Sequence, residues 1–353
     1  MSKRKEEPSM PPSSAASKPV VLKSDSAISA PSLCDILTRW AAADPGRQAM
    51  SNLIMRIAEA SIPLAARLAQ GKLPGDPTAI VGTNDSGDAQ KALDMAAHDH
   101  FIDAFHGVSV ASVLSEEVED VTDVDAGGAF DIAMDPIDGS GNIGIGAQLG
   151  AFFAIFPAGE SFLRSGRDVI AAAYVSFGHS IDLGFSVGQG VHIATLDATT
   201  GAFHVHRENA TVPQSHNTIA LNASYYRRWS QGLQNYVDDL MAGKDGPLER
   251  DFNFRWPAAA VGDLNRILNR GGLFLYPGDT RPGYEKGYLR LAYEAFPIAF
   301  LMEQAGGIAT DGAAPVLDLA PSRLHDRVPL IFGSKREAEI LHGYFAGTAV
   351  PDA

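Results

Sequence analysis

The chain has 353 residues and a formal net charge of −14 at pH 7, because 42 aspartates and glutamates outnumber 28 lysines and arginines. The length allows two domains or one large one, and the acidic balance argues against sequence-independent binding of nucleic acid, which needs clustered cations. A single cysteine, Cys34, excludes an intrachain disulfide and a cysteine-based zinc site, and no apolar run reaches the roughly 18 residues of a membrane span. We therefore expect a folded protein of the cytoplasm, with no secretory signal.

The first elements of the chain follow a polar N-terminal stretch. Residues 1–30 are rich in serine, proline and alanine and nearly lack large apolar residues, which predicts a disordered tail. A short extension added for expression would have the same composition. Apolar residues at helical spacing then predict a helix over Ser51–Gln70, kinked at Pro63, and a second helix over Ala89–Phe105.

Strands and helices mix in both halves of the remaining chain, which indicates α/β or α+β layering. The predicted strands are Val108–Leu114, Ala129–Met134, Gly150–Phe156, Ile170–Phe177, Val191–Thr195, Thr218–Leu221, Leu273–Tyr276 and Pro329–Phe332. The predicted later helices are Trp229–Met241, Ala258–Asn269, Ala295–Ala305 and Arg336–Phe345. A polar stretch at Asp197–Gly201 suggests a boundary near residue 200, so we expect subdomains at 31–200 and 201–353.

Acidic residues gather in four short segments. These are Gly87–Asp94, Ser115–Glu117, Asp135–Asn142 and Tyr293–Glu294. The second and third directly follow predicted strands, and loops that leave the carboxyl ends of strands are where α/β folds place ligands. Converging carboxylates suit a hard cation such as Mg²⁺, which takes oxygen ligands from carboxylates, water and phosphate.

The order of residues within these segments favours a metal-dependent phosphate site. Pro136 fixes the backbone of Asp135–Asp138, so that the two aspartates can converge while the Ile137 carbonyl stays free as a further ligand. Gly139-Ser140-Gly141 offers N–H groups and a hydroxyl to a phosphate at a turn or helix start. The pair Glu116-Glu117 offers one ligand and one proton acceptor, although alone it would be read as a solvated acidic loop.

With these motifs the sequence resembles the class I fructose-1,6-bisphosphatases, within the magnesium-dependent, lithium-sensitive sugar-phosphatase superfamily. The resemblance starts at about Ser51, and its most specific stretch is Gly262–Gly312. The Asp-Pro-Ile-Asp-Gly motif alone would equally fit inositol monophosphatase, but Tyr293–Pro297 has the bisphosphatase form. The resemblance implies a layered αβαβα fold with mixed sheets. It also implies metal-dependent hydrolysis of the 1-phosphate of D-fructose 1,6-bisphosphate, as in gluconeogenesis or the Calvin cycle.

By position, the resemblance implies two or three Mg²⁺ ions per subunit, with Mn²⁺ or Zn²⁺ as possible substitutes. The implied ligands are Glu116, Asp135, Asp138, Glu294 and the carbonyl of Ile137. Glu117 and Asp94 correspond to the family's proton-accepting pair, and Asp88 to a further acid near the third metal position. Without the resemblance, Asp88 would be read as a helix cap and Asp94 as part of a polar helix face.

The resemblance also implies a substrate-binding set for the sugar and its phosphates. The set is Asp138, Gly139, Ser140, Gly141, Asn222, Tyr225, Arg255, Trp256, Tyr276 and Tyr288. In the family, the arginine at the position of Arg255 reaches across a subunit interface, which implies a dimer or, as in the family, a homotetramer. Read alone, Arg255 would be a surface cation and Tyr276 a strand-end aromatic residue.

Three positions depart from the family's pattern. Trp256 replaces a phosphate-binding tyrosine, Gly141 replaces a serine, and Tyr288 replaces a lysine after a loop, 277–287, that is two residues longer. The cations that could restore the missing charge are Lys286, Arg281 and Arg290. A wider pocket could admit sedoheptulose 1,7-bisphosphate, so a sedoheptulose-preferring or bifunctional phosphatase is the alternative.

Other functions find little support in the sequence. His98 and His100 lack zinc-ligand spacing, and neither a GxSxG elbow nor a Walker A motif is present. A regulator that binds metal and sugar phosphate without turnover is disfavoured because every matched acid is present. Inhibition by AMP is not expected, because the vertebrate helix start is absent around Ala30–Ala43 and its lysine-tyrosine pair reads Ala129-Phe130. The expected partner is a small sugar bisphosphate, with no nucleic acid or membrane.

Overall fold

The computed structural model describes residues 28–83 and 89–347. The chain divides into two units, Met1–Ala30 and Pro31–Ala353, and the fold below is that of the second unit. The predicted tail falls almost entirely outside the described residues, as does Asp88. None of the helices in the described ranges is both long and apolar enough to span a membrane.

An eight-stranded sheet dominates the first half of this unit, in the order β10-β9-β8-β7-β6-β5-β3-β4. Its strands are β3 (Val110–Ser115), β4 (Thr122–Asp123), β5 (Phe130–Asp138), β6 (Leu149–Pro157), β7 (Ala171–Phe177), β8 (Ile181–Ser186), β9 (Val191–Asp197) and β10 (Ala202–Ala210). All neighbours are antiparallel except β3 and β5. That parallel pair brings the carboxyl ends of two strands to the same edge of the sheet.

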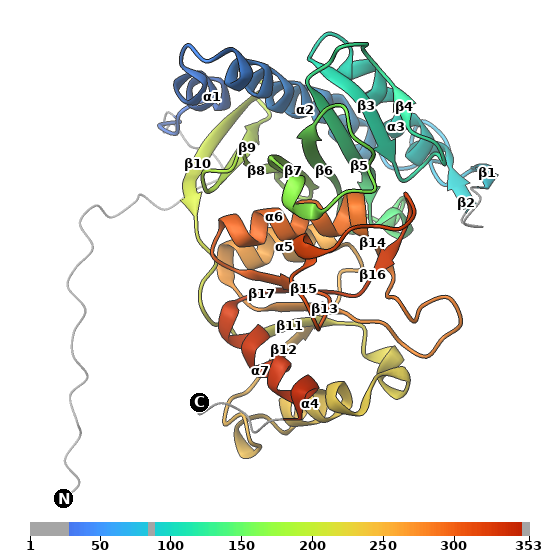
Figure 1. The fold of residues 1–353 in the computed structure, drawn as a ribbon, viewed down its shortest axis with the longest axis vertical. Coiled ribbons are helices and arrows are strands. Elements are labelled where there is room, and N and C mark those ends of the chain that lie inside the picture. The colour runs from blue at the N-terminus through green and yellow to red at the C-terminus, as the bar shows by residue number, and fades with distance from the viewer. Residues whose placement is uncertain (1–27, 84–88, 348–353) are drawn as a thin grey trace, which may run out of the picture. The chain divides into compact units, whose positions relative to one another are not determined.

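Helices cover both faces of this sheet (Figure 1). The outer layer is α1 (Leu33–Ala41), α2 (Pro45–Ala69) and α3 (Ala92–Phe105), and the inner layer is α5 (Ala260–Arg270) and α6 (Phe296–Gln304). Side chains of β6 alternate between two apolar clusters: Phe152 and Phe156 pack with the inner helices, and Phe153 and Ile155 with the outer ones. This period of two is that of a strand buried on both faces.

A second sheet of five strands lies on the other side of the inner helices, in the order β12-β11-β13-β17-β15 (Figure 1). Its strands are β11 (Thr218–Leu221), β12 (Asn253–Arg255), β13 (Leu273–Tyr276), β15 (Ile308–Thr310) and β17 (Leu330–Gly333). Its outer face is covered by α4 (Gln231–Ala242) and α7 (Lys335–Ala346). The helix-sheet-helix-sheet-helix layers confirm the expected αβαβα fold with mixed sheets.

Two small sheets complete the fold. The first pairs β1 (Ile80–Thr83) with β2 (Ala89–Lys91), and the second pairs β14 (Leu289–Arg290) with β16 (Arg327–Val328). The prediction of a helix from Ala89 was therefore wrong for three residues, and α3 begins at Ala92.

The other predicted core elements are present with shifted ends. The helix predicted from Ser51 begins at Pro45, because Asp44 caps it by accepting a hydrogen bond from the Arg47 N–H, and it runs through Pro63. The segment Asp135–Asp138, predicted as a loop after a strand, is instead the last part of β5.

Candidate active site

Four carboxylates meet where β3 and β5 end beside the turn that precedes α6. Glu116 directly follows β3, and Asp135 and Asp138 lie in the last four residues of β5. Glu294 lies in a π-helical turn, Leu291–Ala295. Carboxylate oxygens of Asp135, Asp138 and Glu294 lie within 4.8 Å of one another, and all three side chains are buried. Such a set of hard oxygen donors fits a divalent cation.

Backbone N–H groups fix one oxygen of each of these three carboxylates. Pairing of β5 with β6 breaks between Asp135 and Asp138, where Pro136 has no N–H to donate. Within that break the Ile137 N–H donates to Asp135 Oδ1 (2.9 Å). The Val261 N–H donates to Asp138 Oδ2 (2.8 Å), and the Arg290 N–H to Glu294 Oε2 (2.6 Å).

Burial is the main cause that raises the pKa of all four carboxyls. It raises the pKa of Glu116 to about 7 although Arg290 lowers it in part, and that of Asp138 to about 6 although backbone N–H groups oppose it. The pKa values of Asp135 and Glu294 lie well above their ordinary range because burial is reinforced by repulsion from the neighbouring carboxylates. These carboxyls therefore keep their protons to a higher pH than exposed carboxyls do, and a divalent ion would compete with those protons.

Asp94 and Glu117 act electrostatically on carboxyls of this cluster, Asp94 on Glu116 and Glu117 on Asp135. Asp94 is 3% exposed, and its Oδ1 has no hydrogen-bond partner among the described residues. Burial raises its pKa to about 6 although Lys91 opposes the shift, so Asp94 is not part of a solvated helix face. Glu117 is also buried, and its N–H donates to Ser115 Oγ, which is hydrogen-bonded to His98 Nδ1 (2.9 Å).

A cleft of about 310 Å³ opens over the cluster. Besides the carboxylates, its wall includes three aromatic rings that contact one another, Trp256, Tyr276 and Tyr288, and we call this part of the wall the aromatic end. Of the predicted site residues, those that line it are Glu116, Asp135, Ile137, Asp138, Gly139, Ser140, Gly141, Asn222, Trp256, Tyr276, Tyr288 and Glu294. Gly139, at φ 79°, directly precedes the short helical turn Ser140–Asn142, where the sequence predicted a turn or a helix start.

Two predicted substrate residues do not line this cleft. Arg255 is exposed on β12, the edge strand of the second sheet, and lines a separate basic hollow with Arg266 and Arg270. Tyr225 lies in the turn that follows Asn222 and is covered by Arg281. The expectation that Arg255 acts on another subunit stays a prediction.

Two cations near the cluster were not predicted for that position. Arg290 is buried, donates its N–H to Glu294 and acts electrostatically on Glu116. Lys91 Nζ donates to the Ser140 carbonyl, within the turn predicted to bind phosphate. A charged residue inside the otherwise apolar run Leu289–Ala292 was the available signal for Arg290; nothing in the sequence pointed to Lys91.

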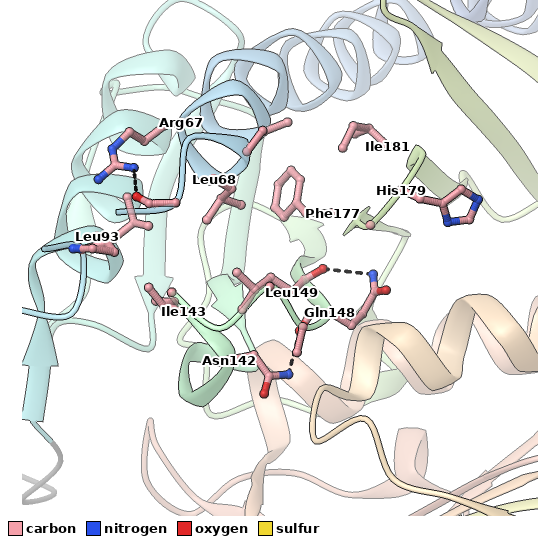
Figure 2. A pocket seen from close by; sticks show the side chains of 18 residues that line it. Arg67, Leu68, Leu93, Asn142, Ile143, Gln148, Leu149, Phe177, His179 and Ile181 are labelled. Atoms are coloured by element: carbon pink, nitrogen blue, oxygen red, sulfur yellow. Dashed lines mark hydrogen bonds between the residues drawn. The ribbon is translucent and has the colours of Figure 1, made fainter. Parts of the chain in front are cut away.

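A larger cavity, about 430 Å³, lies at the carboxyl end of α2. Its wall mixes apolar side chains, among them Leu68, Phe177 and Ile181, with the polar side chains of Arg67, Gln148 and His179 (Figure 2). None of the described residues that line it is acidic. Asn142, which ends the turn Ser140–Asn142, lines this cavity and donates its Nδ2 to the carbonyls of Gln148 and Pro257, so the cavity borders the turn without offering metal ligands.

Comparisons with known proteins agree with this geometry. Two family models match: "Fructose-1-6-bisphosphatase, N-terminal domain" over residues 36–208 and "Fructose-1-6-bisphosphatase, C-terminal domain" over residues 212–346. A "Fructose-1,6-bisphosphatase class 1" of Brucella anthropi is 50% identical over 331 residues, covering 93% of this chain and 97% of the relative. One of Brucella suis is also 50% identical, over 330 residues, with the same coverage.

Solved structures agree as well. The holo form of Leishmania major fructose-1,6-bisphosphatase matches with a TM-score of 0.83 at 27% identity, covering 90% of this chain and all of the other. The apo form of the same protein matches with a TM-score of 0.79 at 25% identity and the same coverage.

Proposed function

The chain belongs to the class 1 fructose-1,6-bisphosphatase family, a family of metal-dependent phosphatases, and we propose that its buried carboxylate cluster, loaded with Mg²⁺, is where the 1-phosphate is released. The reaction is hydrolysis of fructose 1,6-bisphosphate to fructose 6-phosphate and phosphate. The observation that carries the assignment is the convergence of Asp135, Asp138 and Glu294 in a buried cleft, with their oxygens within 4.8 Å.

The residues of the cluster fit two or three divalent ions. Asp135, Asp138 and Glu294 would hold one ion, and Glu116 and the Ile137 carbonyl would complete the neighbouring positions, with Asp88 as a further acid. When bound, such ions polarise phosphoryl oxygens, lower the pKa of water and neutralise the leaving oxygen. Mn²⁺ or Zn²⁺ would bind the same oxygen donors.

The chain's own groups bind the phosphate and accept the proton. N–H groups and the hydroxyl of Gly139-Ser140-Gly141 donate to the phosphate, with Lys91 holding the Ser140 carbonyl. Glu117 and Asp94 take the proton of the attacking water. A pKa of about 6 for Asp94 suits this role, because a base works best when its pKa is near the working pH.

The sugar and its second phosphate lie toward the aromatic end of the cleft. Asn222, Trp256, Tyr276 and Tyr288 line that end, with Tyr225 behind Asn222. Arg255 of a second subunit reaches the same phosphate, in a homotetramer built from dimers. The exposed position of Arg255 on an edge strand, away from its own cleft, supports a role in another subunit.

Sedoheptulose 1,7-bisphosphate is the second candidate substrate, because Trp256, Tyr288 and the longer loop alter the sugar end. The test is phosphate release from each bisphosphate in Mg²⁺, with and without excess EDTA. We expect EDTA-sensitive release from fructose 1,6-bisphosphate with the higher kcat/KM. A higher kcat/KM for the heptulose would reverse the preference, and EDTA-resistant release from both would refute the metal assignment.

A further inference from the structure

The substrate's second phosphate needs a cation at the aromatic end of the cleft. A phosphate monoester carries about −1.5 to −2 charges at pH 7, which costs free energy to bind without a cation. Among the described residues that line the cleft there is no lysine or arginine. Arg255 of a second subunit would bring one positive charge, so a further cation of the same chain is called for.

A row of stacked rings leads from the cleft to such a cation. The ring of Tyr276 stacks on that of Tyr288, with centroids 4.9 Å apart at 18°. Tyr288 in turn stacks on Tyr284, at 5.6 Å and 6°. Trp256 closes the inner end, edge-on to Tyr276 at 5.0 Å. The loop 277–287 thus continues the wall of the cleft outward.

Arg281 lies at the outer end of this row, in a three-sided clamp. Its guanidinium carbon is 3.6 Å from the ring centroid of Tyr225 and 4.2 Å from that of Tyr284. Its Nε and Nη2 donate to the carboxylate of Asp279, at 2.7–3.0 Å. The side chain keeps 24% of its surface exposed, so the clamp does not enclose it completely.

An ionised carboxylate holds Arg281 in the clamp, and further arginines lie close by. Burial alone would raise the pKa of Asp279, but hydrogen bonds from Arg281 hold it below its ordinary value, so the carboxylate stays ionised. Arg228 acts on the same carboxylate, and Arg327 lies over the rings of Tyr284 and Tyr288. These two arginines offset the charge of Asp279 and leave the region cationic.

The other two candidates are placed differently. Arg290 is buried at the metal end, where it donates to Glu294 and, through Nη1, to the His325 carbonyl. Lys286 is exposed on the loop, outside the row of rings. Of the three candidate cations, Arg281 is therefore the one that aromatic rings and a carboxylate hold in place. It lies beside the turn that follows Asn222.

We propose that Arg281, held by Tyr225, Asp279 and Tyr284, binds the substrate phosphate remote from the metal ions and supplies the charge that Tyr288 lacks. This rests on the proposed function, since it assumes a bisphosphate in the cleft. A guanidinium suits the task because its planar fork donates several hydrogen bonds to phosphate oxygens.

The test compares fructose 1,6-bisphosphate with fructose 1-phosphate, which keeps the reacting phosphate and lacks the distal one. For Arg281→Ala we expect kcat/KM on the bisphosphate to fall about ten- to a hundredfold, chiefly through KM, because a charge-assisted contact is lost. The kcat/KM on fructose 1-phosphate should stay within about twofold, which also shows that the variant is folded. Fructose 6-phosphate, as a competitive inhibitor, should weaken by the same factor as the bisphosphate.

Two further variants separate the explanations. Lys286→Ala removes an exposed cation of the same loop and should leave both substrates unaffected, while Arg281→Lys should recover part of the loss. An equal loss on both substrates, no loss at all, or the same loss in Lys286→Ala would overturn the proposal. A wild-type protein that releases no phosphate from the bisphosphate would instead refute the proposed function, and the role of Arg281 with it.

Discussion

At the scale of single residues, the buried carboxylates of the cluster lower the stability of the fold when they are ionised, and the same carboxylates are suited to bind a cation. Asp135, Asp138 and Glu294 each have one oxygen fixed by a backbone N–H, which leaves the other oxygen to face its neighbours. Buried like charges at this spacing are costly, and the raised pKa values express that cost. A bound cation would neutralise the repulsion between these carboxylates.

The pH dependence of stability should follow from these carboxyls. The pKa values of Asp138 and Glu116 are raised to about 6 and about 7 in the folded state, so the folded state binds more protons than the unfolded one between pH about 4 and 7. The stabilisation is complete below pH about 4 and is lost as the pH rises through 7. Calorimetry in EDTA should show a melting temperature several degrees lower at pH 8 than at pH 5.

Mg²⁺ binds the ionised cluster, so it should raise the melting temperature more at pH 8 than at pH 5. Glu116→Gln removes one of the titrating groups and should flatten the pH dependence in EDTA. A melting temperature in EDTA that rises over this interval would contradict the raised pKa values.

Asp94 provides a second prediction at this scale. Asp94→Asn keeps the shape of the side chain but removes a proton acceptor, so kcat at saturating Mg²⁺ should fall by about a hundredfold or more. The matched control is Asp103→Asn, on the exposed side of the same helix, which should keep normal kcat. Undiminished phosphate release by Asp94→Asn would remove Asp94 from the mechanism.

The positions of several cluster residues could be predicted from the sequence, because these residues closely follow apolar runs that predict strands. Glu116 and Asp135 closely follow predicted strands, and Asp135 and Asp138 were expected to converge; in the structure these two aspartates converge with Glu294. Lys91 could not be predicted, because its partner, the Ser140 carbonyl, is 49 residues away and is reached only through the tertiary fold.

At the scale of elements, the phosphate-binding turn depends on a glycine. Gly139 has φ 79°, and a Cβ there would lie 2.6 Å from the Cβ of Ala259. Gly139→Ala should therefore lower the free energy of unfolding by about 1–3 kcal/mol and raise KM, since the turn must shift. Urea denaturation and steady-state kinetics check both effects.

Gly141 gives the matched control for stability. A Cβ at Gly141 would meet no atom within 4 Å, so Gly141→Ala should change the free energy of unfolding little. Equal losses of stability in the two variants would mean that the conformation at Gly139 is not what the turn requires.

Elements with apolar periodicity were predictable, and those fixed by distant pairing were not. The helix α5, for example, has a clear apolar stripe at helical spacing, and it was predicted as Ala258–Asn269. By contrast, Ala89–Lys91 is a strand because it pairs with Ile80–Thr83, and β5 extends through Asp138 because β6 pairs beyond Pro136. Such pairings depend on the tertiary structure and cannot be predicted from local strand propensity.

At the scale of the whole molecule, β12 is an edge with one partner. It pairs only with β11 among the described strands, and its three residues are exposed, with Phe254 at 39%. An uncovered edge strand with an exposed aromatic residue is a common place for subunit contact. Arg255, at its end, is then available to a second subunit.

A mixing experiment tests whether Arg255 acts in trans. Arg255→Ala should raise KM at least about tenfold, and Asp135→Asn should be inactive. Subunits of the two variants, dissociated and reassembled together, should regain activity of low KM, because the intact cluster of one receives the arginine of the other. Reassembly of each variant alone is the control. Absence of recovery in mixtures of demonstrated hybrid composition would place the action of Arg255 in its own subunit or nowhere.

A metal centre at the buried carboxylates is tested most directly by titrating Mg²⁺ into EDTA-treated protein while phosphate release from fructose 1,6-bisphosphate and the heat of binding are both measured. The wild type should bind Mg²⁺ and gain activity over the same concentration range, as should Asp123→Asn, which alters an exposed acid outside the cluster. Asp135→Asn should lose both the heat and the activity while keeping its fold. Wild-type activity that Mg²⁺ does not change, or an active Asp135→Asn, would contradict a metal centre at the buried carboxylates.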